Sequence, residues 1–141
     1  MLTDEELTEG IIGAAIEVHR CLGPGLLESA YHACLLHELE QRGFNARSEV
    51  LLPVRYKDIT VESGYRIDLL VNDRVIIELK AVDRLAEIHT AQTLTYLKLS
   101  RIETGLILNF NSTRLMSSSG FKRVVNQRPS ARPPSPPRLR G

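Results

Sequence analysis

Apolar residues recur at helical spacing near the start of the chain. They lie three or four positions apart in residues 3–21, and residues 26–41 repeat the pattern. The segment Gly23-Pro24-Gly25 ends the first predicted helix, and Gly43 ends the second in the manner of a glycine C-cap. The chain therefore begins with two amphipathic helices joined at a tight corner.

Beyond Ala46 the period becomes that of strands. The predicted elements are strands at 50–56, 65–71 and 75–81, a helix at 85–99, and strands at 104–109 and 121–125. Pro53 indicates an edge or a bulge, and Asn72 and Asp73 indicate a short turn. This order predicts an α/β fold, with a mixed central sheet flanked by helices.

The last part of the chain differs in composition from the rest. Residues 127–141 are rich in Pro and Arg and have no apolar pattern, which predicts a disordered tail after one domain at 1–126. The 141 residues include 18 Lys and Arg and 17 Asp and Glu, but four Arg lie in the tail. The domain then has 14 basic against 17 acidic residues, a net charge of about −3, which argues against a broad basic surface and allows a local basic cleft.

Several classes of protein are excluded by what the sequence lacks. No apolar run approaches the roughly 18 residues that span a bilayer, so we expect a soluble, cytoplasmic protein. The motifs GxGxxG and GxxxxGK[ST] do not occur, which argues against a nucleotide-phosphate loop. Cys21 and Cys34 belong to no CxxC pair or Cys/His cluster, so we expect buried thiols and no zinc site.

Three charged residues interrupt strongly apolar strands: Asp68, Glu78 and Lys80. Burial of an unpaired charge is costly, so such residues are usually paired, metal-bound or functional. Glu78 and Lys80 are two positions apart and share one face of a strand. The competing interpretation is a solvated hairpin in which these two residues pair with each other.

The length of the turn decides whether Asp68 joins this face. A two-residue loop places Asp68 opposite Ile77, away from Glu78, whereas a three-residue loop that includes Arg74 places Asp68 directly opposite Glu78. In the second register the two carboxylates repel unless a cation lies between them, and their oxygens suit Mg²⁺ or Mn²⁺. Such a site meets the needs of phosphodiester hydrolysis, with Lys80 orienting water or stabilising charge.

The spacing of these residues resembles a known superfamily. Asp68, nine intervening residues and Glu78-Leu79-Lys80 are similar to the PD-(D/E)xK nuclease motif, with Ile67 in place of the proline. Gly25-Leu-Leu-Glu28-Ser-Ala-Tyr31 resembles the signature of the GxxExxY family within that superfamily, and the similarity covers about residues 7–125. The resemblance implies a restriction-endonuclease-like core and a Mg²⁺- or Mn²⁺-dependent nuclease that acts on nucleic acid, DNA more than RNA.

The resemblance also implies roles for individual residues. Asp68, Glu78 and Lys80 would be catalytic. The metal ligands would be Glu28, Asp68, Glu78 and the backbone carbonyl of Leu79. Gln92 and Tyr96 resemble a QxxxY element that contacts nucleic acid or braces Lys80. Substrate contacts are expected from Gln92, Tyr96, Arg66 and Tyr31.

Some of these residues have a second interpretation. Glu28 falls in the first turn of its helix, where a carboxylate also acts as a cap. Tyr31 either hydrogen-bonds to a metal-bound carboxylate or covers the core, and Arg66 either contacts phosphate or pairs with Glu78 or Glu62.

The histidines have no metal-ligand spacing, and we expect them at the surface or partly buried: His19, His32, His37 and His89. His19 is the one for which contact with the site is also considered. Two functions compete with the nuclease. One is a catalytically silent module of the same fold that binds nucleic acid or a protein partner, and the other is a recognition role for the tail. A homodimer would let a nuclease of this size reach two strands.

Overall fold

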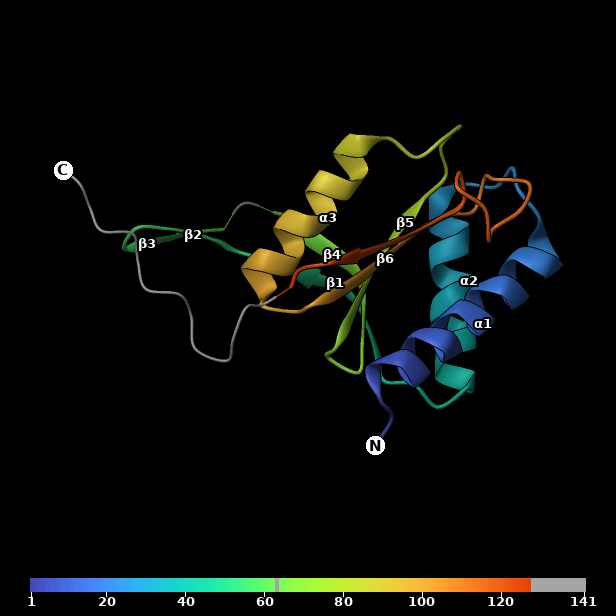
Figure 1. Cartoon of the computed structure of the whole chain (residues 1–141), viewed down its shortest axis with the longest axis horizontal. Coiled ribbons are helices and arrows are strands. Elements are labelled where there is room, and N and C mark those ends of the chain that lie inside the picture. The colour runs from blue at the N-terminus through green and yellow to red at the C-terminus, as the bar shows by residue number, and fades with distance from the viewer. Residues whose placement is uncertain (63, 128–141) are drawn as a thin grey trace.

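The computed structural model describes residues 1–62 and 64–127, and Figure 1 shows how their elements are arranged. The elements are α1 (Asp4–Leu22), α2 (Glu28–Gln41), β1 (Ala46–Leu51), β2 (Val54–Tyr56), β3 (Ile59–Val61), β4 (Arg66–Val71), β5 (Val75–Lys80), α3 (Glu87–Ser100), β6 (Thr104–Asn109) and β7 (Phe121–Val125). The expected α/β fold with a mixed sheet is confirmed. The expected tail lies, apart from its first residue, outside the described residues.

The first helix begins at a well-formed cap. The Thr3 hydroxyl accepts a hydrogen bond from the Glu6 N–H, and the Glu6 carboxylate accepts one from the Thr3 N–H. Gly23 ends α1 at a φ of 68°, and Gly25 continues the corner at a φ of 104°, both in the region that favours glycine. Helix α2 follows directly, so its first residue, Glu28, lies at the corner.

Five strands form the central sheet in the order β1-β4-β5-β6-β7. The pairs are antiparallel except β5 and β6, which are parallel and are joined through α3. Val71 pairs with Val75 and Leu69 with Ile77, so the β4–β5 turn has three residues. Of the two registers considered, the structure has the one that places Asp68 opposite Glu78.

The two faces of the sheet are covered by different helices (Figure 1). On one face, α1 and α2 pack against side chains that include Leu69, Ile77 and Leu106. On the other, α3 packs against side chains that include Ile76 and Ile107. The central strands are therefore buried on both sides, which accounts for their nearly continuous apolar sequence.

A two-stranded hairpin, β2 and β3, was not expected. Pro53 divides the predicted strand at 50–56 into β1 and β2, because proline cannot donate to a strand ladder. The short strand β3 then pairs with β2, and the hairpin projects from the body of the molecule (Figure 1).

The expectation of buried thiols is wrong. Cys21 and Cys34 are both free and exposed. The buried face of α2 is formed by Tyr31, Leu35 and Leu39, and Cys34 lies beside that face. Among the described residues, no helix combines the length and apolarity that crossing a membrane requires.

Candidate active site

The site begins where the β4–β5 ladder ends. Beyond the Leu69–Ile77 pair, the Asp68 N–H donates to the Glu78 Oε2 over 3.2 Å, and the Leu79 N–H donates to the Asp68 Oδ2 over 2.8 Å. Carboxylate oxygens thus take positions that backbone carbonyls hold in a regular ladder. The register required by the sequence analysis is present, and each carboxylate is oriented by the backbone of the opposite strand.

Burial makes this pair of carboxylates electrostatically costly. Glu78 is only 4% exposed, and burial followed by the charge of Asp68 raises the pKa of Glu78 to about 8. Burial also raises the pKa of Asp68, partly offset by the hydrogen bond from the Leu79 N–H. Because the Asp68 and Glu78 carboxyl groups lie close together and are shielded from water, binding of a proton or a cation between them is favoured.

Lys80 lies on the same strand, two residues from Glu78, and is half-buried. Its positive charge acts to lower the pKa of Glu28, Asp68 and Glu78. Within the part of the chain that the structure describes, Lys80 forms no ion pair, and the Glu78–Lys80 pair of the competing interpretation is not formed. Its ammonium group is therefore available to an incoming ligand.

Glu28 brings a third carboxylate toward the site from the start of α2. The N-cap residue of this helix is Leu27, which makes no side-chain cap hydrogen bond, and no hydrogen bond of the Glu28 carboxylate is found among the described residues. Burial and then the charge of Asp68 raise the pKa of Glu28. Glu28 and Asp68 line one pocket of about 300 Å³, together with Ser29, His32, Ala33, Ser48 and Glu49.

The donor set suits a hard divalent cation, since it consists of carboxylate oxygens, with Glu78 buried, Asp68 partly buried and Glu28 exposed. Asp68 and Glu78 each use one oxygen for a backbone N–H, and their second oxygens have no partner among the described residues. Across residues 1–62 and 64–127, no three His, Cys, Asp or Glu side chains form a ready group for a metal ion. Asp68 and Glu78 are thus the centre of the candidate site, and Glu28 is a neighbour of that pair.

Helix α3 brings one residue, Tyr96, close to these carboxylates. Tyr96 is 6% exposed, and its pKa is raised by burial first and then by the charges of Glu78 and Asp68. Gln92, one turn earlier, is exposed. The QxxxY pair therefore has one residue beside the carboxylates and one at the surface.

The side chains of Tyr31 and His19 form hydrogen bonds with backbone groups and not with the carboxylates of the site. Tyr31 is fully buried, and its hydroxyl donates to the Gly23 carbonyl over 2.6 Å and accepts from the Leu26 N–H over 3.1 Å. Of its two expected roles, the structure favours covering the core, and the hydroxyl also fixes the α1–α2 corner. The His19 Nε2 lies 2.8 Å from the Ser112 carbonyl oxygen, which holds the ring against the loop that follows β6.

Arg66 pairs with a residue that was not considered. Its Nη1 lies 3.4 Å from the Glu49 Oε1 on β1. The expected pairing of Arg66 with Glu78 or Glu62 was therefore wrong. The Arg66 side chain is exposed. Surface ion pairs of this kind contribute little to stability, so the guanidinium remains able to bind phosphate.

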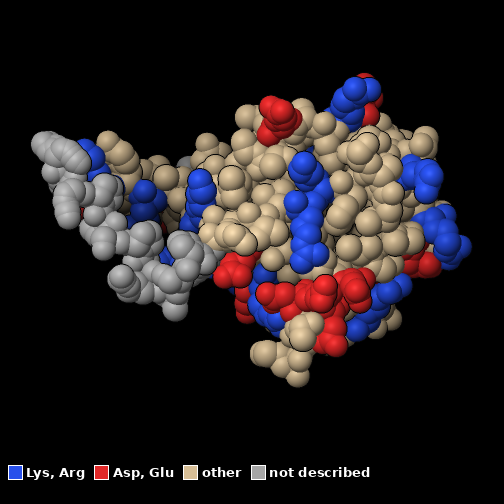
Figure 2. Space-filling model, in the orientation of Figure 1, with Lys and Arg blue, Asp and Glu red and all other residues tan. Residues whose placement is uncertain are grey.

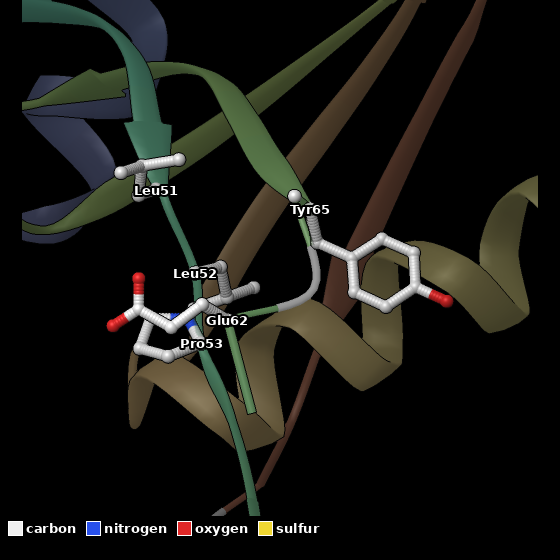
Figure 3. A pocket seen from close by; sticks show the side chains of 6 residues that line it. Leu51, Leu52, Pro53, Glu62 and Tyr65 are labelled. Carbon is white, nitrogen blue, oxygen red and sulfur yellow. The ribbon is translucent and has the colours of Figure 1, made fainter. Parts of the chain in front are cut away.

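Another pocket lies outside this constellation, at the root of the hairpin. It has a volume of about 420 Å³, and its lining is mostly apolar: Leu51, Leu52, Pro53, Glu62, Gly64 and Tyr65. In Figure 3 the Tyr65 ring points away from Glu62, toward α3, in agreement with its 6.2 Å centroid distance from Tyr96. None of the predicted site residues lines this pocket.

The surface charge agrees with the composition. Figure 2 shows Lys, Arg, Asp and Glu interspersed over one face, with an acidic group near the start of α1, whose first turn contains Asp4, Glu5 and Glu6. No broad basic surface covers this face.

Asn109 is a supporting residue that the sequence analysis missed. It is fully buried and lies beside Lys80 in the parallel β5–β6 register. Its amide accepts from the Val82 N–H over 3.0 Å and donates to the carbonyls of Val82 and Ser119 over 2.9 Å. It thereby fixes the chain after Lys80. The only signal in the sequence is a polar residue at the end of an apolar strand.

Comparison with known proteins gives the class to which this fold and site belong. The profile of the PD-(D/E)XK nuclease superfamily matches residues 5–124. The chain belongs to the PD-(D/E)XK nuclease superfamily, whose enzymes generally use divalent metal ions, typically Mg²⁺. No curated protein and no solved structure matches the chain.

Proposed function

We propose that the domain at residues 1–126 is a metal-dependent nuclease that hydrolyses phosphodiester bonds of nucleic acid, with DNA as the favoured substrate and Mg²⁺ or Mn²⁺ as the cofactor. The observation that carries this proposal is the end of the β4–β5 ladder. There the Asp68 N–H donates to the Glu78 carboxylate and the Leu79 N–H donates to the Asp68 carboxylate, and Lys80 beside them has no ion-pair partner among the described residues. Membership in the superfamily supports the same conclusion.

The residues divide into two groups. Glu28, Asp68, Glu78 and the Leu79 carbonyl would hold the cation. When bound, a divalent cation polarises a phosphoryl oxygen and makes bound water more acidic. Lys80 donates to a non-bridging phosphate oxygen or to the attacking water, and its charge opposes the negative charge that develops at phosphorus. The Asp68 and Glu78 hydrogen bonds keep both carboxylates in place, so little reorganisation is needed.

Residues around this centre would bind the rest of the substrate. Gln92 is exposed one turn from Tyr96, and Arg66 is exposed on the strand that carries Asp68. Both can donate to phosphate oxygens. We also propose that the chain belongs to the GxxExxY group of the superfamily, which the spacing of Gly25, Glu28 and Tyr31 in the sequence supports. A cytoplasmic location and a homodimer that reaches both strands of a duplex belong to the same proposal.

A cleavage assay tests this function. Labelled single- and double-stranded DNA and RNA are incubated with the full chain in Mg²⁺, Mn²⁺ or EDTA. The variant is Asp68→Asn, and the matched control is Asp73→Asn, an exposed aspartate at the β4–β5 turn. We expect cleavage that requires the metal, is lost in Asp68→Asn and persists in Asp73→Asn. Equal cleavage by both variants would contradict the proposal.

The alternative function, a catalytically silent module that binds nucleic acid, predicts a different result. If no substrate is cut, calorimetric titration with Mn²⁺ separates the alternatives, because a nuclease site binds the ion through Asp68. Nucleic-acid binding without either cleavage or metal binding would favour the silent module.

A further inference from the structure

His32 lies in the pocket that joins α2 to the candidate active site. It is four residues after Glu28 and therefore on the same face of the helix. Glu28, His32 and Asp68 all line the pocket of about 300 Å³. In the sequence His32 is an isolated histidine, because the residues of β1 and β4 that line the pocket with it lie far away along the chain.

The imidazole ring is fixed on one side and open on the other. The His32 Nε2 lies 2.7 Å from the Ser48 Oγ on β1. The other ring nitrogen, Nδ1, has no hydrogen-bond partner among the described residues. When the Ser48 hydroxyl donates to Nε2, the proton of the neutral ring lies on Nδ1, which is then a donor.

The chemistry of the pocket defines what that donor would bind. Three of the seven lining residues are carboxylates: Glu28, Glu49 and Asp68. These carboxylates repel an approaching phosphate oxygen unless a hydrogen-bond donor binds it. Among the side chains that line the pocket, His32 has the nitrogen donor. Positive charge at His32 acts to lower the pKa of Glu28 and of Asp68 against the larger effect of burial, so the ring is electrostatically close to both.

We propose that the His32 Nδ1 binds a phosphate of the nucleic-acid strand on the α2 side of Asp68, with Ser48 holding the ring. The inference rests on the proposed function. It adds a substrate-binding residue on the α2 side of the carboxylates, whereas Lys80 reaches them from β5. His32 contacts the substrate in this arrangement and does not contact the metal.

Two substitutions separate the two ring nitrogens. In His32→Asn the amide lies near the position of Nδ1, and in His32→Gln it lies near Nε2. His37→Ala is the matched control, since His37 is an exposed histidine on the same helix and does not line the pocket. His32→Ala removes both nitrogens.

The experiment measures binding of fluorescein-labelled single-stranded and duplex DNA to the full chain in Ca²⁺, by fluorescence anisotropy. We expect His32→Ala and His32→Gln to bind about tenfold to a hundredfold more weakly, as for loss of a hydrogen bond to a charged group. His32→Asn should recover most of this loss, and His37→Ala should bind as the wild type does. Calcium affinity, measured by calorimetry, should be unchanged in all four.

The outcomes distinguish this inference from the nuclease proposal. Wild-type cleavage together with undiminished binding by His32→Ala overturns the role of His32 and leaves the nuclease intact. DNA binding that depends on His32 without any cleavage leaves the phosphate contact and removes the nuclease. Loss of Ca²⁺ affinity in His32→Ala, or no DNA binding by the wild type, overturns the inference. An equal loss in the Asn and Gln variants also overturns the assignment to Nδ1.

Discussion

Replacement of Glu78 by Gln should stabilise the protein when no divalent cation is present. Glu78 is almost completely buried, and its pKa is raised to about 8 by burial and by Asp68. In the unfolded chain the pKa of Glu78 returns to its ordinary value of 4.5. The folded state therefore binds more protons than the unfolded state between these values, and the free energy of unfolding decreases as the pH rises through that range.

The magnitude follows from the two pKa values. Each pKa unit corresponds to about 1.4 kcal/mol, so the difference between 4.5 and about 8 sets an upper limit of about 5 kcal/mol. Water entry and local relaxation reduce the cost of a buried charge, and we expect about 2 kcal/mol. Gln keeps an oxygen that can accept from the Asp68 N–H, so the hydrogen bond to β4 is retained.

The assay is urea unfolding of the wild type and Glu78→Gln in EDTA, at about pH 5 and about pH 8.5, on either side of most of the titration range. The two proteins should differ little at the lower pH, and the variant should be more stable at the higher pH. Saturating Mn²⁺ should stabilise the wild type more than the variant. A variant that is less stable than the wild type at both pH values would refute the reasoning.

Four further substitutions test the supporting structure, each by urea unfolding. Tyr31→Phe removes the hydroxyl that binds Gly23 and Leu26 at the corner and should cost about 1–3 kcal/mol, whereas no loss would contradict the bracing role. Asn109→Ala should cost about 3 kcal/mol, because the buried hydrogen bonds of its side chain with Val82 and Ser119 are lost; an unchanged free energy of unfolding would contradict its supporting role. Gly105→Ala should destabilise by about 1–3 kcal/mol, since its Cβ would lie 2.9 Å from the Thr93 Cγ2. Gly13→Ala should stabilise by about 0.5–1 kcal/mol, because its Cβ would meet only the flexible end of Arg42 inside a helix, and an opposite sign at either glycine would contradict the packing described.

The sequence predicted those elements that depend on local pattern. The strands β6 and β7 have the expected bounds because they are short apolar runs between polar turns. The helices were expected to within two residues at each end. The hairpin was missed because β3 has three residues, too few for a pattern to be visible.

The register of β4 and β5 could be reduced to two alternatives but not decided. Asn72 and Asp73 both adopt positive φ values, and the Asn72 side chain accepts from the Asn45 N–H. Arg74 bonds to Asp4 and to the Leu2 carbonyl, near the start of the chain. These contacts of the three-residue turn join residues far apart in the sequence. They therefore could not be predicted from the sequence of the turn itself.

The charged centre of the candidate site could be proposed from the sequence, whereas the contacts at its margins could not. Asp68, Glu78 and Lys80 were identified because charge is unexpected in apolar strands. The contacts of His32 with Ser48 and of Arg66 with Glu49 join separate elements across the edge of the sheet. The prediction that both cysteines are buried was wrong, because the position of a residue on its helix outweighs the general tendency of free thiols to be buried.

The most direct test of the central claim is the rate of metal-dependent phosphodiester cleavage by Lys80→Ala, measured beside Lys98→Ala. Lys98 is an exposed lysine in the last turn of α3, so the two variants lose the same group in different places. If Lys80 acts at the developing charge, Lys80→Ala should lower the rate by about a hundredfold or more in Mg²⁺, while Lys98→Ala cleaves as the wild type does. Equal rates for the two variants would contradict the assignment of this site.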